Sequence, residues 1–309
     1  MSTTGATLVH EALLYRNPIE YLAGTVGFIE SGLARGEPVL VATTSANLAL
    51  LRDALGATAE RVELANMCQA GRNPGRILPG ILLPFVEAHH GKPVRIIGEP
   101  IWAGRTDLEY PACVQHESLI NAALAGRPAW IRCPYDAAAL DQRALDDAER
   151  THPRLVDGAV ERRSDRYGDP VRTAADFNLP LPAPPEHAAT VPVQLATLAE
   201  LRRFVADQAA AAGLPPARAA DATIVVNELV TNTISHASGT GTLACWPEGG
   251  GLVCQLTDDG HITDPLVGRL PPAIESVRGR GLFLVNQLCD LVRVHTGPGS
   301  TTIRVRIGP

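Results

Sequence analysis

The sequence predicts two α/β domains: a parallel α/β domain at residues 1–158 and a two-layer α/β sandwich at residues 193–309. A chain of 309 residues exceeds what one hydrophobic core usually organises. Strand-like and helix-like segments alternate in the first part, whereas two helices precede the strands in the last part. Between them, residues 159–192 are charged and then rich in proline, which is typical of a linker.

In the first domain, short apolar segments favour strands and longer amphipathic segments favour helices. The expected strands are residues 38–44, 61–66, 93–98 and 129–133. The expected helices are residues 17–33, 46–55, 79–89 and 113–125. Strands that alternate with amphipathic helices predict a mostly parallel sheet that is covered on both faces.

The second domain has a different order of elements. Helices are expected at residues 195–212, 216–237 and 281–289. Strands are expected at residues 241–247, 251–258, 290–296 and 300–307, with glycine-rich turns inside each of the two pairs. This order predicts helices on one face of a mixed sheet.

Composition excludes several classes of protein. The formal net charge of −6 and the pI near 5.9 argue against a dominant nucleic-acid or anionic-membrane surface. No apolar run approaches the roughly 20 residues that span a bilayer, and the N-terminus lacks the pattern of a signal peptide. The six cysteines form no C-x-x-C pair, so neither a zinc knuckle nor a disulfide framework is indicated. We therefore expect a cytoplasmic protein without a nucleic-acid or membrane partner.

The most informative segment is the predicted helix at residues 216–237. Glu228, Asn232 and His236 recur at four-residue spacing and therefore share one face. The carboxamide oxygen of Asn232 is a suitable ligand for Mg²⁺. Glu228 lies one turn earlier, where a carboxylate can accept a proton from an attacking hydroxyl group. For an isolated Glu-x-x-x-Asn pair, a solvated helix face is the simpler explanation.

Three later motifs favour a nucleotide site over a solvated helix face. Asp258 and Gly260 follow a predicted strand, where the carboxylate can accept a hydrogen bond from an exocyclic amine such as that of adenine; a plain surface turn is the alternative. Glycine amides and arginine side chains at the start of the next helix are suited to phosphate, with a flexible hinge as the alternative. These residues are Arg278, Gly279, Arg280, Gly281 and Leu282. Thr301 lies in the last glycine-rich turn.

In these motifs, residues 195–308 resemble the Bergerat-type ATP-binding domain of histidine kinases, type II topoisomerases, Hsp90 chaperones and anti-sigma-factor kinases. The run Asn-Glu-Leu-Val-Thr-Asn-x-x-x-His-Ala is most similar to the anti-sigma serine kinases of the RsbW and SpoIIAB type. The resemblance implies ATP and Mg²⁺ as cofactors and an anti-sigma-factor antagonist or a sigma factor as partner, with dimers common among such kinases. It implies that Glu228 is the catalytic base, Asn232 the magnesium ligand and Asp258 the adenine contact, with Gly279 and Gly281 in the phosphate lid and Thr301 as a polar support.

Two departures keep other functions open. Ile262 stands where the family often has a second glycine, and the lid segment between His261 and Gly279 is short. Both favour a non-catalytic switch in which ATP shapes a partner-binding surface. A sensor histidine kinase is a third alternative, but it needs a two-helix phosphoacceptor segment where this chain has the proline-rich stretch containing His187.

The first domain carries polar residues after its predicted strands. The turn at residues 43–47 lacks the glycines and lysine of a P-loop, so a phosphate cradle is not expected there. A ligand is expected at the carboxyl ends of the strands, within reach of Glu99, Trp102 and Arg105, or of Cys133 and Tyr135. The alternatives are an ion pair between Glu99 and Arg105 and a core role for the others. The residues His10, His116, His152 and Cys133 are also compatible with a metal or haem site, although their spacing has no recognised pattern.

Residues 8–156 also resemble a family, the methanogen and methylotroph sensory (MEDS) domain. The motifs are His-Glu-Ala-Leu-x-Tyr from residue 10, Gly-Arg-Asn-Pro-Gly-Arg from 71, Ile-Gly-Glu-Pro-Ile-Trp from 97, His-Glu at 116 and Cys-Pro-Tyr-Asp from 133. The resemblance implies a RecA-like sensory domain that responds to small hydrocarbon derivatives without nucleotide chemistry. The candidate contacts for its small-molecule ligand are His10, Glu99, Trp102, Arg105, His116, Cys133 and Tyr135. Together, the two resemblances imply a bacterial signalling protein in which a sensory domain controls an ATP-dependent serine/threonine kinase.

Overall fold

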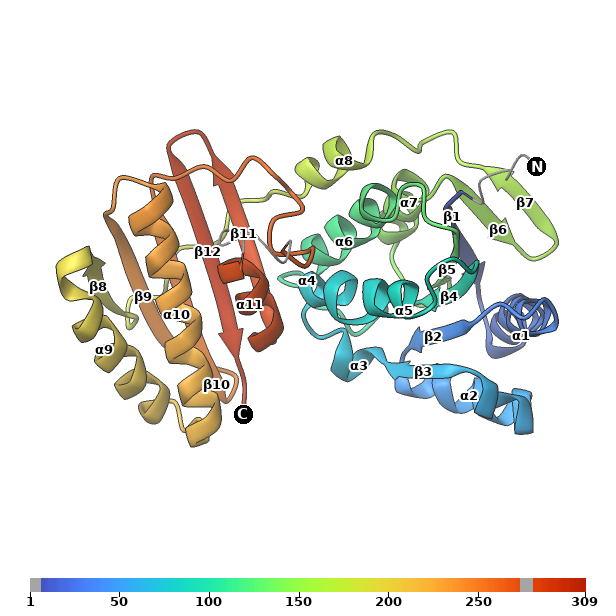
Figure 1. Cartoon of the computed structure of the whole chain (residues 1–309), viewed down its shortest axis with the longest axis horizontal. Helices are drawn as coiled ribbons and strands as arrows, with labels where there is room; N and C mark the ends of the chain where they lie inside the picture. Colours follow the sequence, from blue (N-terminus) through green and yellow to red (C-terminus); the bar gives the residue numbers. More distant parts are fainter. Residues whose placement is uncertain (1–6, 273–279) are drawn as a thin grey trace. The chain divides into compact units, whose positions relative to one another are not determined.

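The computed structural model describes residues 7–272 and 280–309 and divides into two compact units, Met1–Phe177 and Asn178–Pro309 (Figure 1). The fold class is α/β, as predicted: one unit contains a largely parallel sheet and the other an antiparallel sheet with helices on it.

The N-terminal unit contains a seven-stranded sheet in the order β3-β2-β4-β5-β1-β6-β7. Its strands are β1 (Val9–Tyr15), β2 (Val39–Thr43), β3 (Glu63–Asn66), β4 (Val94–Gly98), β5 (Ala129–Asp136), β6 (Arg154–Asp157) and β7 (Val160–Arg163). Neighbouring strands are parallel except for the β6–β7 hairpin. Every residue of β2 and β4 is buried, which requires cover on both faces because alternate side chains point in opposite directions.

Two groups of helices supply this cover. The helices are α1 (Pro18–Ala34), α2 (Ser45–Leu55), α3 (Met67–Ala70), α4 (Pro74–Ile77), α5 (Leu83–Ala88), α6 (Tyr110–Ala123), α7 (Gln142–Thr151) and α8 (Pro170–Asp176). Side chains of α1 and α2 form one hydrophobic cluster with β1, β2 and β4. Helix α6 contacts α7 and α8, and it carries residues that meet β1 and β5 on the opposite face.

Strand β1 lies inside the sheet between β5 and β6, but the apolar pattern did not predict it as a strand. Its sequence, VHEALLY, contains His10 and Glu11, both of which are buried. Arg132 on β5 donates to Glu11 across 2.7 Å and to the carbonyl of Gly24 on α1. A buried charge with a partner is compatible with a central strand, but it removes the apolar run by which such strands are recognised.

The C-terminal unit contains a five-stranded sheet in the order β11-β12-β10-β9-β8. Its strands are β8 (Ala189–Val193), β9 (Gly241–Glu248), β10 (Gly251–Asp258), β11 (Leu291–Gly297) and β12 (Ser300–Ile307). All neighbouring pairs are antiparallel, so the expected mixed sheet is wrong. The reason is topological: the connection through α11 places β12, and not β11, beside β10.

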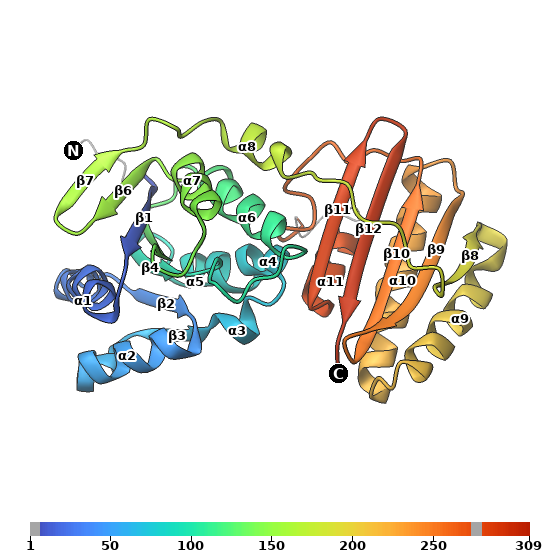
Figure 2. The same cartoon turned by 180° about the vertical axis from the view of Figure 1, so that it is seen from behind.

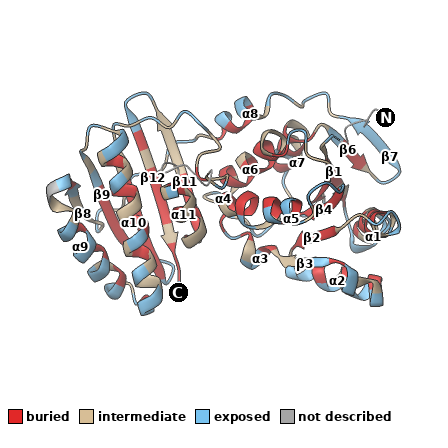
Figure 3. Ribbon diagram, in the orientation of Figure 1, coloured by how far each residue is buried: buried red, intermediate tan, exposed pale blue. Residues whose placement is uncertain are grey.

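Helices α9 (Leu198–Ala211), α10 (Pro216–His236) and α11 (Arg280–Leu288) cover one face of this sheet (Figure 2). Their apolar sides and the inner faces of β9, β10 and β12 form the core of the unit, whose residues are buried in Figure 3. This is the two-layer sandwich that the sequence predicts. Among the helices of the described ranges, none has both the length and the apolar character that a membrane span requires.

The segment expected to be a linker, residues 159–192, contains β7, α8 and β8. Part of it crosses the face of the C-terminal sheet that lies opposite the helices (Figure 2). There the guanidinium group of Arg304 donates to the carbonyl of Pro182 and lies 5.0 Å from the ring centre of Trp246. Trp246 is buried in a small cluster to which Ala188 contributes. The prolines favour an extended conformation, and this part of the segment between the two domains packs on a sheet.

Candidate functional site

The C-terminal unit contains a cavity of about 520 Å³ between α10, the end of β10, the segment that follows it, and the start of α11. Its lining includes seven of the predicted site residues: Asn232, His236, Asp258, Gly260, Gly281, Leu282 and Thr301. Apolar side chains complete the wall, among them Leu229, Leu256, Ile262, Val267 and Ile303. A mostly apolar cavity with a few convergent polar groups is typical of a small-molecule site.

Helix α10 presents Asn232 and His236 to this cavity because its other side is anchored in the core, whereas Glu228 is not among the lining residues and meets Gly281 instead. Val225, Val226 and Leu229 are almost completely buried. Glu228 and Asn232 are only partly buried, and His236 is exposed near the end of the helix. The four-residue spacing therefore gives one polar side and one core side, as the sequence predicts.

The first turn of α11 meets the polar side of α10 at Gly281. A Cβ atom at Gly281 would lie 3.0 Å from Oε2 of Glu228 and 3.3 Å from the amide atoms of Asn232. Glycine is therefore the residue that lets the N-terminus of α11 approach these two side chains without crowding them. Arg280 begins the helix and is exposed. Arg278 and Gly279, which were predicted to belong to the same phosphate site, lie outside the described residues.

Asp258 is held at the end of β10 by two hydrogen bonds. Its Oδ2 atom accepts from the Thr233 hydroxyl at 2.6 Å, and its Oδ1 atom accepts from the Gly260 amide at 2.9 Å. Thr301 pairs with Asp258 across the sheet and donates to the Gly260 carbonyl. These contacts fix the carboxylate at the wall of the cavity and give Thr301 a supporting position.

Ile262 is also fixed in place. Its amide donates to the hydroxyl of Thr296 at 2.9 Å, and its side chain packs against the core of the unit. The Thr296 hydroxyl in turn lies 2.7 Å from that of Thr301. The residue that replaces the family's second glycine therefore belongs to an ordered wall of the cavity.

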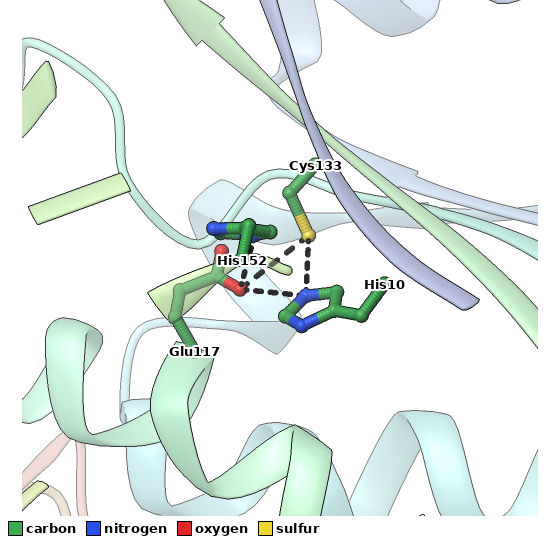
Figure 4. Close-up of side chains that lie close together, drawn as sticks. All are labelled: His10, Glu117, Cys133 and His152. Atoms are coloured by element: carbon green, nitrogen blue, oxygen red, sulfur yellow. Dashed lines mark hydrogen bonds and ion pairs between the residues drawn. The ribbon is translucent and has the colours of Figure 1, made fainter. Parts of the chain in front are cut away.

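In the N-terminal unit, two of the predicted sensory residues come together with two others. His10 on β1 and Cys133 on β5 meet Glu117 on α6 and His152 at the end of α7 (Figure 4). All four side chains are buried, and their nearest nitrogen, oxygen and sulfur atoms lie within 4.8 Å of one another. Burial lowers the pKa of His10 to about 4 and raises the pKa of the Cys133 thiol.

The other sensory candidates are distributed over different surroundings. Glu99 accepts hydrogen bonds from the amide of Thr44 and the side chain of Asn47, and burial raises its pKa. Arg105 stacks on Trp102, with its guanidinium carbon 3.8 Å from the ring centre, and pairs with Glu109. Trp102 and Arg105 line a separate cavity of about 210 Å³.

One histidine of the predicted set lies elsewhere in the structure. His116 is buried on α6 but is not part of the group, which contains its neighbour Glu117. The metal alternative in the sequence combined His10, His116, His152 and Cys133. In the structure, Glu117 takes the place of His116 in this group. Consecutive helical residues point about 100° apart, so only one of an adjacent pair faces the sheet. Tyr135 borders the group through an edge-on contact with His152.

Comparison with known proteins gives a family match for each unit. Residues 9–153 match the methanogen/methylotroph, DcmR sensory domain (MEDS), and residues 191–307 match the histidine kinase-like ATPase domain. Among solved structures, the RsbU and RsbW domains of Rv1364c from Mycobacterium tuberculosis are 18% identical with a TM-score of 0.31, over 40% of this chain and 33% of that one. The matched part thus spans about a third of that protein's length. The search of curated proteins gave no match. The chain thus joins a segment that matches the MEDS sensory domain to a segment that matches the histidine kinase-like ATPase domain.

Proposed function

We propose that the C-terminal domain binds ATP with Mg²⁺ and transfers phosphate to a serine or threonine of a protein partner, as anti-sigma-factor kinases do, under control of the MEDS domain. The observation that carries the proposal is the meeting of Glu228, Asn232 and Gly281 at the N-terminus of α11. A carboxylate, a carboxamide and a helix N-terminus are the groups that a bound metal–triphosphate requires. An anti-sigma-factor antagonist is the proposed acceptor, and a sigma factor is a second proposed partner.

The residues fit the proposed nucleotide in three ways. The cavity of about 520 Å³ lies in the size range of cofactor sites. Asp258 presents a fixed carboxylate that is suited to the amino group of adenine, and the apolar wall suits the faces of a purine ring. The missing side chain at Gly281 leaves room beside Glu228 and Asn232, where a Cβ atom would otherwise lie.

The roles of the side chains follow from their chemistry. ATP supplies the phosphoryl group and Mg²⁺ neutralises its charge. Asn232 offers a carboxamide oxygen to the metal, and the α11 N-terminus offers amide hydrogens to phosphate oxygens. Glu228 holds its carboxylate where it can orient the acceptor hydroxyl and take its proton. Positioning and charge neutralisation account for catalysis of this kind.

The proposal is tested with the full-length protein, radiolabelled ATP, Mg²⁺ and an anti-sigma-factor antagonist as acceptor. We expect acid-stable phosphate on a serine or threonine of the acceptor. Acid-labile phosphate on the chain itself would instead indicate a histidine kinase. ATP-dependent binding of the acceptor without transfer would indicate the switch, which the ordered wall at Ile262 favours because it removes a flexible point beside the nucleotide.

Gly281→Ala is expected to weaken ATP binding several-fold, because the added methyl group takes space beside Glu228 and Asn232. Isothermal titration calorimetry measures the change. Gly297→Ala is the matched control, since a Cβ atom there would meet nothing within 4 Å. Equal affinity of both variants for ATP would show that the nucleotide does not approach the start of α11.

A further inference from the structure

The group formed by His10, Glu117, Cys133 and His152 in the N-terminal unit has the properties of a metal site. The residues come from β1, α6, β5 and the end of α7, and each directs one ligand-type atom to a common point (Figure 4). We propose that these four side chains bind one divalent transition-metal ion, with zinc as the expected metal. This inference is independent of the proposed nucleotide chemistry.

The distances between the ligand atoms fit a tetrahedral ion. Nε2 of His10 and Nε2 of His152 each lie 3.3 Å from Oε2 of Glu117. The Cys133 sulfur lies 3.4 Å from His10 Nε2 and 3.4 Å from Glu117 Oε2. Bonds of about 2.0–2.3 Å in a tetrahedral zinc site place neighbouring ligand atoms about 3.3–3.8 Å apart. Four edges of the expected tetrahedron are therefore already present.

The hydrogen bond to Asn121 fixes the tautomer of His10. The Asn121 amide nitrogen donates to the carbonyls of Ser118 and Thr151, so the amide oxygen is the atom that faces His10. That oxygen lies 3.1 Å from Nδ1 of His10. An amide oxygen only accepts hydrogen bonds, so Nδ1 carries the hydrogen, and Nε2 of the neutral ring presents a lone pair to the group.

The same reasoning applies to His152. Its Nδ1 atom lies 2.9 Å from the backbone carbonyl of Ala148, which also only accepts. In a neutral ring Nε2 therefore presents the lone pair to the group, and this buried atom lies 3.3 Å from Oε2 of Glu117 without a hydrogen bond in the described part of the chain. Metal-bound histidines characteristically donate their second ring nitrogen to a carbonyl or carboxylate in this way. Both histidines thus have the orientation and the tautomer of ligands.

The consequence is a surplus of electron pairs at the centre of the group. With neutral imidazole rings, two nitrogens, a carboxylate oxygen and a sulfur face one another, and the thiol hydrogen of Cys133 satisfies one contact. Buried acceptors that face each other without hydrogens are unfavourable. A divalent ion satisfies all four atoms together and removes the thiol proton.

The ligand types identify the class of metal. Two imidazoles and a thiolate favour zinc and related ions over magnesium or calcium, which prefer oxygen ligands. Four protein ligands in a buried position make a closed site, which is characteristic of structural zinc and leaves no position for a catalytic water. The ion would tie two sheet strands to α6 and to the α7–β6 connection, and would therefore stabilise the sensory unit.

The test is the metal content of the full-length protein purified without chelators, measured by inductively coupled plasma mass spectrometry. We expect about one zinc per chain. Cobalt reconstitution should give thiolate-to-cobalt charge-transfer absorption in the near ultraviolet, and Cys133→Ser should remove that band. Cys289→Ser, a buried cysteine of the other unit, should keep it. Chelation should lower the thermal unfolding temperature, and zinc should restore it.

Two results would overturn the proposal. Folded wild-type protein that holds far less than one ion per chain, both as purified and after incubation with zinc, would show that the group is a hydrogen-bonded core network. Bound cobalt without the charge-transfer band would show that Cys133 is not a ligand. Both measurements use the wild-type chain, so they remain decisive even if a variant fails to fold.

Discussion

Glu228→Gln is expected to slow phosphoryl transfer by roughly 10²–10⁴-fold, the usual contribution of a positioned general base. Glutamine keeps the size of the side chain beside Gly281 but cannot accept the proton of the attacking hydroxyl. ATP affinity should change little, because the proposed metal ligand is Asn232 and the proposed adenine contact is Asp258. Single-turnover transfer from labelled ATP and calorimetric ATP binding, measured on the same preparation, separate the two effects.

Glu200→Gln is the control for this experiment. Glu200 lies in the first turn of α9 and is exposed, so its loss changes the net charge in the same way without altering the cavity. We expect wild-type transfer from this control. Normal transfer by Glu228→Gln would refute the assignment of the base, and a matching loss of ATP affinity would assign Glu228 to binding instead.

Asp258→Asn is expected to weaken ATP binding by roughly 10- to 100-fold, which corresponds to the loss of a charged hydrogen bond of about 1.5–3 kcal/mol. Both carboxylate oxygens act as acceptors, since Thr233 donates to one and the Gly260 amide to the other. In asparagine one of these atoms becomes an NH₂ group, which can no longer accept from Thr233 or from an adenine amine. Calorimetry with ATP, and with GTP as an analogue that lacks the amine at that position, measures the effect.

The neighbouring residue supplies the matched control. Asp259 is one residue further along, and its carboxylate accepts from the backbone amide of Ser238; neither of these two residues lines the cavity. Asp259→Asn should bind ATP as the wild type does. If the two variants bind ATP equally well, Asp258 does not contact the base.

The sequence predicts the C-terminal unit closely. The helix expected at residues 216–237 is α10, Pro216–His236, and the hairpin expected around residues 248–250 joins β9 to β10. The signals are local: the helix has a four-residue apolar period, and the hairpin has a turn in which Gly249 and Gly250 both adopt positive φ. The polar stripe that includes Glu228 and Asn232 follows from the same period.

Strand β1 of the N-terminal unit and the proline-rich segment of the C-terminal unit are predicted less completely, because both depend on distant partners. Strand β1 is stabilised by the pairing of Glu11 with Arg132, and that pair is separated by 121 residues. The proline-rich segment is ordered by Arg304, which is 122 residues away from Pro182. Neither contact leaves a periodic pattern in the sequence, so the sequence predicts neither the strand nor the packing of the proline-rich segment.

The sequence by itself determined the α/β class, the two-layer sandwich and the helix face that carries Glu228, Asn232 and His236, since these depend on periodicity and turn residues within short windows. Tertiary structure alone decided that Gly281 meets this face, that the sheet is antiparallel throughout, and that Glu117 joins His10, Cys133 and His152. The physical reason is the distance along the sequence over which each interaction acts. Periodicity determines which side of an element is buried, whereas the meeting of four elements at one point depends on the order in which strands pair and helices pack.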